Sequence, residues 1–121
     1  MVKNAHIPIK YVKKGWGYEK WIVNKSEYCG KLLFFYSGKK CSWHTHVLKD
    51  EVFYLQSGKM IVRHAMSDEP EKPFENLLTA GDVFEVPIGR RHQMIALEDC
   101  ELFEFSTQHF EDDSYRVVKG D

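Results

Sequence analysis

The chain has 121 residues, of which 43% are hydrophobic and 29% charged, and its formal net charge is -1 at pH 7. This composition is typical of a folded globular protein, and the balanced charge argues against a nucleic-acid or membrane partner. No apolar run reaches the roughly 18 residues of a membrane-spanning helix, and the first residues lack the apolar core of a signal peptide. We therefore expect a cytoplasmic protein with one domain over residues 1–121.

Short runs rich in β-branched and aromatic residues recur along the chain, separated by turn residues such as Gly58 and Gly81. Taken in chain order, the expected strands are residues 18–24, 31–36, 43–47, 52–56, 59–65, 82–86, 92–97, 101–106 and 114–118. The polar segment 67–75 is expected to be a hairpin loop. No window of roughly 11 residues or more shows helical periodicity. Short strands at this spacing predict an all-β sandwich or small barrel.

Three cysteines, Cys29, Cys41 and Cys100, form an odd set without a Cys-x-x-Cys pair. This pattern predicts free thiols and no disulfide framework. Cys41 stands three residues before a histidine. We expect it to be a small packing residue, with metal ligation or nucleophilic chemistry as the alternatives.

Two histidines and a glutamate follow one another closely in the segment 38–58. His44 and His46 stand two apart on an expected strand, so their side chains share one face. Polar residues before Glu51 are suited to a turn, after which Glu51 can return beside the two imidazoles. Two histidines and a carboxylate on one wall form a partial coordination sphere for a divalent metal. The alternative is a set of exposed polar residues near a hairpin.

A further histidine, His92, begins an expected strand after a tight Pro-x-Gly turn and is a fourth candidate ligand. Together the two segments resemble the motifs of the cupin superfamily. Residues 38–58 match G-x5-H-x-H-x4-E-x6-G at every fixed position. Residues 81–96 match G-x5-P-x-G-x2-H-x3-N except that Ala96 replaces the final Asn, which is not a metal ligand.

The resemblance implies an all-β, double-stranded β-helix barrel of the cupin or jelly-roll type, with two antiparallel sheets and at most one or two helical turns. It also implies one divalent transition metal (Fe, Mn, Ni, Co or Zn) held by His44, His46, Glu51 and His92. Four ligands would close a tetrahedral zinc site, whereas a six-coordinate ion would keep two positions open for substrate. Because neutral imidazoles are the ligating form, we expect occupancy to fall as the pH drops through the histidine range near ~6.5.

Two flanking segments resemble small cupins similar to mannose-6-phosphate isomerases. Residues 16–22 match a W-G-x-Y/E-x-W pattern, and residues 106–116 contain an S-T…D-D-x-Y-R ending. The resemblance implies a small-molecule substrate of carbohydrate type. The alternative reading of the second segment is structural, with Asp113 and Arg116 forming a salt bridge in the tail.

The resemblance favours an isomerase or related lyase that acts on a small sugar, sugar acid or sugar phosphate. Such an enzyme polarises substrate oxygens at a metal and moves a proton from the adjacent carbon with a nearby base. The candidate proton carriers are the titratable residues on strands expected to line or flank the barrel, namely Tyr36, His64, Glu85 and Glu104.

Two alternatives remain open. A non-haem iron dioxygenase would use the same three histidines and glutamate together with an apolar pocket. Five residues are candidates for that pocket: Phe34, Phe53, Met94, Phe103 and Phe105. The second alternative is a non-catalytic ligand-binding or sensory cupin.

Apolar residues near the N-terminus predict an interface. Ile7, Ile9, Tyr11 and Val12 are too hydrophobic for a free arm and are suited to add a strand to the sheet edge of a second copy. We therefore expect a homodimer, an arrangement that is common among cupins.

Overall fold

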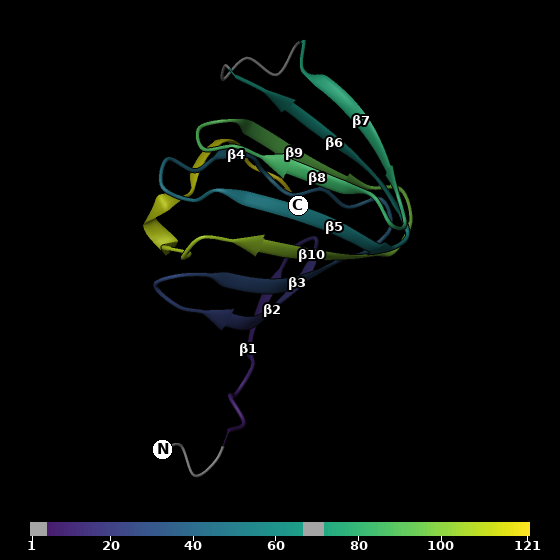
Figure 1. The fold of residues 1–121 in the computed structure, drawn as a ribbon. Coiled ribbons are helices and arrows are strands. Elements are labelled where there is room, and N and C mark those ends of the chain that lie inside the picture. The colour runs from purple at the N-terminus through teal and green to yellow at the C-terminus, as the bar shows by residue number, and fades with distance from the viewer. Residues whose placement is uncertain (1–4, 67–71) are drawn as a thin grey trace.

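The computed structural model describes residues 5–66 and 72–121, which form two antiparallel β-sheets (Figure 1). The six-stranded sheet contains, in spatial order, β1 (Lys10–Lys14), β2 (Gly17–Asn24), β3 (Cys29–Phe35), β10 (Cys100–Ser106), β5 (Glu51–Ser57) and β8 (Val83–Val86). The five-stranded sheet contains β11 (Tyr115–Val118), β4 (Trp43–Thr45), β9 (Arg91–Ala96), β6 (Lys59–Ala65) and β7 (Phe74–Thr79). A short 3-10 helix, η1 (Glu111–Asp113), precedes β11. Among these residues, no helix has the length and apolarity to cross a membrane.

Strands that are distant in the sequence are neighbours in both sheets. β10 pairs with β3 on one side and with β5 on the other, and β9 pairs with β4 and β6. These crossovers between two facing sheets make the jelly-roll barrel. The predicted all-β, double-stranded β-helix fold is therefore confirmed.

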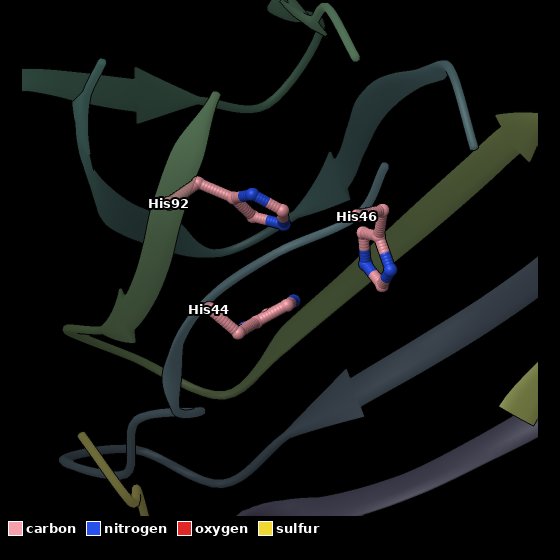
Figure 2. Close-up of side chains that lie close together, drawn as sticks. All are labelled: His44, His46 and His92. Carbon is pink, nitrogen blue, oxygen red and sulfur yellow. The ribbon is translucent and has the colours of Figure 1, made fainter. Parts of the chain in front are cut away.

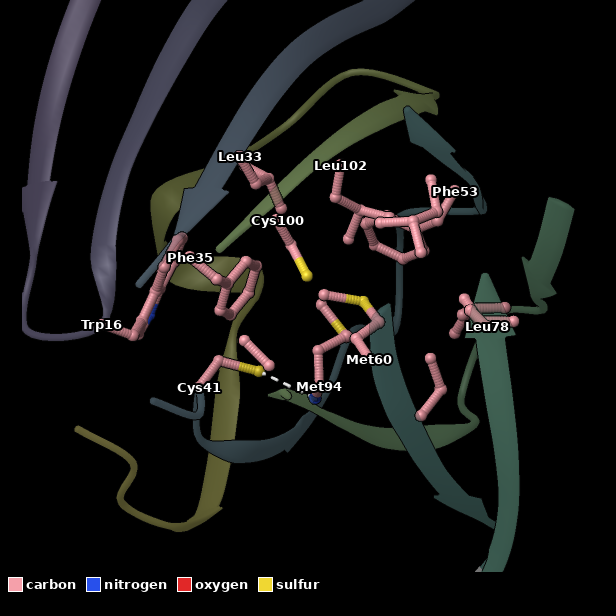
Figure 3. Close-up of a cluster of buried hydrophobic side chains, with 14 residues drawn as sticks. Trp16, Leu33, Phe35, Cys41, Phe53, Met60, Leu78, Met94, Cys100 and Leu102 are labelled. Carbon is pink, nitrogen blue, oxygen red and sulfur yellow. Dashed lines mark hydrogen bonds between the residues drawn. The ribbon is translucent and has the colours of Figure 1, made fainter. Parts of the chain in front are cut away.

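The hydrophobic core lies between the sheets, and both contribute to it (Figure 3). Leu55 and Leu102 of the six-stranded sheet and Met60 of the five-stranded sheet are each 0% exposed. Cys41 belongs to this core, where burial raises the pKa of its thiol to about 12. All three cysteines are free and buried, and Cys41 packs as expected for a small core residue.

The nine predicted strands all form, with their ends displaced by at most two residues. The structure adds β1 and β7, which the sequence analysis did not predict as strands of this chain. β1 pairs with β2 of its own chain, and β7 forms a hairpin with β6. Residues 67–71 of the expected loop lie outside the described residues, whereas Phe74 and Glu75 belong to β7. Most side chains of both added strands are exposed. Their sequences therefore lack a clear alternation of buried and exposed residues, and backbone pairing with a neighbouring strand forms them.

Cross-strand register places charged residues on the wall that faces the core. On β5, Glu51 is 2% exposed and continues the buried series of Phe53 and Leu55. Lys31 of β3 lies directly opposite Glu104 of β10, and both are buried. Residues paired in this way share a face of the sheet. One end of the barrel wall is therefore charged, although the remainder is apolar.

Candidate metal centre

Three histidines meet where β4 pairs with β9. His44 of β4 lies opposite His92 of β9, and His46 follows directly after β4. One ring nitrogen from each residue lies within 4.8 Å of the others (Figure 2). His46 and His92 are buried and His44 is half-buried. The structure thus brings together the three histidines that the two sequence segments supply.

Each imidazole is oriented by a backbone carbonyl. Nδ1 lies 2.8 Å from the Ser42 carbonyl oxygen in His44, 3.0 Å from that of Asp113 in His46, and 3.3 Å from that of Arg90 in His92. A carbonyl oxygen only accepts hydrogen bonds, so Nδ1 carries the proton in each ring and the Nε2 lone pair is available. This arrangement of outer partners is typical of metal-ligating histidines.

Glu51 lies against the histidines. Its Oε1 atom is 3.5 Å from Nε2 of His46, and its Oε2 atom is 3.4 Å from Nε2 of His92. Among the described residues, Oε2 of Glu51 and Nε2 of His92 are buried without a hydrogen-bond partner. Buried polar atoms normally have a partner, and a cation between these two atoms would supply one. Three imidazoles and a carboxylate therefore fit a divalent transition metal.

Burial holds the imidazoles in their neutral form. It lowers the pKa of His44 to about 4 and that of His46 to about 3, and it places the pKa of His92 well below its ordinary value. The pKa of Glu51 is raised to about 8 by burial and by the nearby Glu104 carboxylate, against the opposing effect of Lys49. A divalent cation would favour the ionised form of Glu51.

A cavity of about 540 Å³ lies beside the histidines. Apolar side chains line part of its wall, namely Trp16, Leu33, Phe35, Phe53 and Met94. Buried or partly buried ionisable side chains line another part, namely Glu19, Lys31, Lys49, Glu51, Glu104 and His109. The histidines and the ionisable wall thus face one common space.

Lys49 links the carboxylates of this wall. Its Nζ donates to Oε1 of Glu51 at 2.8 Å, to Oε2 of Glu104 at 3.1 Å and to Nδ1 of His109 at 2.9 Å. Burial alone would lower the pKa of Lys49, but Glu104 and Glu51 outweigh it and raise the pKa above its ordinary value. Burial likewise opposes ionisation of Glu104, yet Lys49 and Lys31 lower its pKa to about 2. At neutral pH, Lys49 and Glu104 are therefore both charged.

Asp113 of η1 fixes the loop that carries Lys49. Its carboxylate accepts hydrogen bonds from the backbone N–H groups of Val47, Leu48 and Lys49 at 3.0 to 3.1 Å. Its backbone carbonyl accepts a hydrogen bond from Nδ1–H of His46. The tail salt bridge with Arg116, which was the alternative reading of this segment, is replaced by this clamp: Asp113 is buried, and Arg116 is exposed at the cavity.

The four candidate proton carriers lie in different environments. Glu104 is buried in the cavity wall. Tyr36 is 50% exposed, Glu85 is exposed on β8, and neither lines the cavity. His64 stacks against Phe74, and its Nε2–H donates to Oδ1 of Asn76 at 2.7 Å, also away from the cavity.

Lys31, Lys49 and His109 belong to the cavity although the sequence analysis singled out none of them for the site. One signal was available for Lys31, because it alternates with Leu33 and Phe35 on an expected strand and so shares their inward face. Lys49 and His109 lie outside strands. No periodicity indicates the direction of their side chains.

Comparisons with known proteins agree with this architecture. Residues 16–118 match the family described as Cupin. No protein of curated function matches the sequence significantly.

Several solved structures share the fold. The capsular polysaccharide assembling protein CapF from Staphylococcus aureus superposes with a TM-score of 0.81 at 17% identity, over 95% of this chain and 33% of that one. KdgF from Halomonas sp. gives a TM-score of 0.66 at 23% identity, over 78% of this chain and 81% of that one. Oxalate decarboxylase from Bacillus subtilis gives 0.77 at 20% identity, over 89% and 30%. The chain thus spans about a third of the CapF and oxalate decarboxylase chains, and these identities establish similarity of fold alone.

The His92→Ala variant should lose its metal. The substitution removes one Nε2 donor, so affinity should fall by more than the roughly 10- to 100-fold that follows loss of an outer partner of a ligand. The matched control is His109→Ala, which removes a histidine from the same cavity whose Nδ1 is already bonded to Lys49. Elemental analysis of the purified variants measures both effects. Equal metal in the two variants would contradict the ligand assignment.

The metal should remain bound at pH values below the ordinary pKa of histidine. Because burial lowers the pKa of His44 to about 4 and that of His46 to about 3, protons compete poorly for the imidazole Nε2 atoms until the pH approaches 4. Above that pH, proton competition falls on Glu51, whose pKa is raised to about 8 in the absence of a metal. The loss through histidine protonation expected near ~6.5 is thereby moved to lower pH. Metal content after dialysis at a series of pH values tests this, and half-loss near pH 6.5 would contradict it.

Proposed function

Because the chain belongs to the cupin family, we propose that it is a metal-dependent enzyme of the isomerase or lyase type, acting on a small sugar, sugar acid or sugar phosphate. The observation that carries this proposal is the ionisable wall that lines the same cavity as the three histidines. Buried charged groups are costly unless a partner satisfies them. A polar substrate with several oxygens supplies such partners, whereas a hydrocarbon does not.

The dioxygenase alternative receives less support from the cavity. Of the five apolar residues considered for it, Phe53 and Met94 line the cavity, while Phe34, Phe103 and Phe105 do not. Phe105 is 55% exposed and stacks beside Phe103. The apolar part of the wall is therefore built largely from other residues than those considered, and the ionisable part is what a hydrocarbon substrate would leave without partners.

The chain's residues support distinct roles in proton transfer. His44, His46, His92 and Glu51 would hold the divalent metal, which when bound would polarise a substrate oxygen. Glu104 is the proton acceptor that we propose: it is ionised, and its hydrogen bonds from Lys49 and Ser106 both fall on Oε2. Among the described residues, this leaves Oε1 for a ligand.

His109 complements Glu104 as a donor. Its Nδ1 accepts the hydrogen bond from Lys49, so Nε2 carries the proton of the neutral ring. Burial lowers the pKa of His109 to about 3, and Lys49 adds to this effect. The imidazole is thus neutral at physiological pH, and we propose that it orients a substrate oxygen by donating from Nε2.

Solvent exchange tests the proposed reaction. The metal-loaded protein, incubated in D2O with aldoses, uronates and sugar phosphates, should introduce deuterium at the carbon beside a carbonyl group, as measured by proton NMR. Glu104→Gln should slow this exchange by roughly 10²- to 10⁴-fold, the usual contribution of a general base, without changing metal content. Glu85→Gln is the matched control, since Glu85 is exposed and outside the cavity.

Two results would contradict the proposal. One is the absence of exchange with every compound of the set by the metal-loaded protein. The other is equal exchange by the wild-type protein and the Glu104→Gln variant. Rapid O2 uptake with a phenol in either case would favour the dioxygenase alternative.

We further propose that the protein is a homodimer joined along β1. This strand lies at the end of its sheet, and the exposed fractions of the side chains that precede or belong to it are 61% for Ile7, 44% for Ile9 and 63% for Tyr11. A second copy would cover these apolar side chains and the sheet edge. Light scattering should give about twice the 14.3 kDa chain mass, and Tyr11→Lys should shift the population toward monomer. A mass of 14.3 kDa at micromolar concentration would contradict the proposal.

A further inference from the structure

Lys31 is a buried lysine without a hydrogen-bond acceptor among the described residues. Its side chain is 2% exposed and lines the cavity. The carboxylate oxygen paired with it, Oε1 of Glu19, lies 3.8 Å from Nζ and already accepts a hydrogen bond of 2.7 Å from Nε1 of Trp21. The ring of Trp21 lies 4.1 Å from Nζ. This ammonium group is thus held by a long ion pair and a cation–π contact.

The contrast with Lys49 indicates what is missing. Both lysines are buried in the same wall, but Lys49 uses its three donors on Glu51, Glu104 and His109. An ammonium group carries three N–H donors, and a buried one is stable only when acceptors surround it. Burial accordingly lowers the pKa of Lys31, although Glu104 opposes this effect. The three N–H donors of Lys49 are all used within the protein, whereas Lys31 retains unused N–H donors for a ligand in the cavity.

We propose that Lys31 binds the carboxylate group of the substrate, so that the cavity takes a sugar acid or a related hydroxy acid in preference to a neutral sugar. This inference rests on the proposed function, because it assigns the substrate class of the same site. The carboxylate would accept the unused N–H groups of Lys31. The remaining hydroxyl and carbonyl oxygens of the substrate would extend along the wall toward Glu104 and the histidines.

The net charge of the ionisable side chains in the cavity favours a ligand that carries one negative charge. A divalent cation at the histidines would favour the ionised form of Glu51. The three carboxylates of Glu19, Glu51 and Glu104 would then stand against the two ammonium groups of Lys31 and Lys49 and the two charges of the cation, which leaves an excess of one positive charge. A monocarboxylate would then neutralise the site, whereas a phosphate dianion would leave a negative charge in a medium of low dielectric.

The more exposed charged side chains that line the cavity also carry a net positive charge. The exposed or half-buried charged side chains of the lining, apart from the imidazoles, include four basic ones, Lys13, Lys14, Arg116 and Lys119, and three acidic ones, Glu19, Glu111 and Asp121. Such a rim raises the local concentration of anions and speeds their entry. The rim attracts any anion, and Lys31 is the group that distinguishes a carboxylate inside.

Binding measurements with a matched pair of ligands test this proposal. D-Glucuronate and D-glucose differ at C6 by the carboxylate, and glucose 6-phosphate adds the dianion. Calorimetric titration of the metal-loaded wild-type protein should give tighter binding of glucuronate than of either other compound. Lys31→Met should weaken glucuronate binding about 10- to 100-fold, the cost of a charge-assisted hydrogen bond, and leave glucose binding unchanged. Lys59→Met, at an exposed lysine on β6, should change neither.

A second variant excludes misfolding as the cause. Glu19→Gln keeps an acceptor for Trp21 and removes the carboxylate that competes for Lys31. It should therefore tighten glucuronate binding severalfold, which a damaged protein would not do. Equal glucuronate affinity in the wild-type and Lys31→Met proteins, or binding of glucose as tight as that of glucuronate, would overturn the inference.

The same titrations on chelator-treated protein separate this inference from the proposed function. Lys31-dependent binding of glucuronate requires no turnover, so it should persist, although weakened, in the metal-free protein. If it persists while no deuterium exchange is found, the enzymatic proposal fails and the carboxylate site stands. If exchange is found, but glucuronate binds no more tightly than glucose and Lys31→Met leaves glucuronate binding unchanged, the carboxylate site fails and the enzymatic proposal stands.

Discussion

The placement of two carboxyl groups within one buried wall is the constraint on which the site depends, and Lys49 resolves it only in part. Glu51 and Glu104 repel each other in this medium of low dielectric, so Lys49 keeps Glu104 ionised while the pKa of Glu51 remains raised to about 8. A divalent cation at the histidines would complete the ionisation of Glu51. Lys49 bonds to both and to His109. Glu51 is thereby held with one oxygen toward the ammonium group and the other toward His92. The geometry of the candidate metal centre thus depends on the hydrogen bond and ion pair between Lys49 and Glu51.

Charge alternates along this wall, and its members differ in function for that reason. From Glu19 through Lys31, Glu104 and Lys49 to Glu51, each charge has an opposite neighbour along the paired strands and the adjoining loop. Such a row is stable in the interior because every member is partly compensated, yet its members differ in the number of their hydrogen bonds. Lys49 uses its three donors within the protein. Lys31 and Oε2 of Glu51 have no hydrogen bond among the described residues and are left for ligands.

The sequence predicted the fold and the histidines well, because both follow from strand periodicity and motif spacing. His44 and His46 share a face by alternation, and His92 begins its strand beside them. The alternation of side chains along a strand also predicts the direction of two candidate proton carriers. Tyr36 follows the inward-facing Phe35 and Glu85 precedes the inward-facing Val86, so both point outward. Strand alternation does not predict the direction of loop side chains such as those of Lys49 and His109. The polar residues around Lys49 indicate a turn, and the burial of Lys49 depends on a contact made by a residue far along the chain.

That contact is the Asp113 clamp, and it makes the loop that carries Lys49 dependent on a distant part of the chain. Asp113 meets Val47, Leu48 and Lys49 across 64 to 66 residues of chain. A substitution in η1 would therefore act at a distance. Loss of the Asp113 carboxylate would leave three backbone N–H groups without their acceptor and release the ammonium group that joins Glu51 to Glu104.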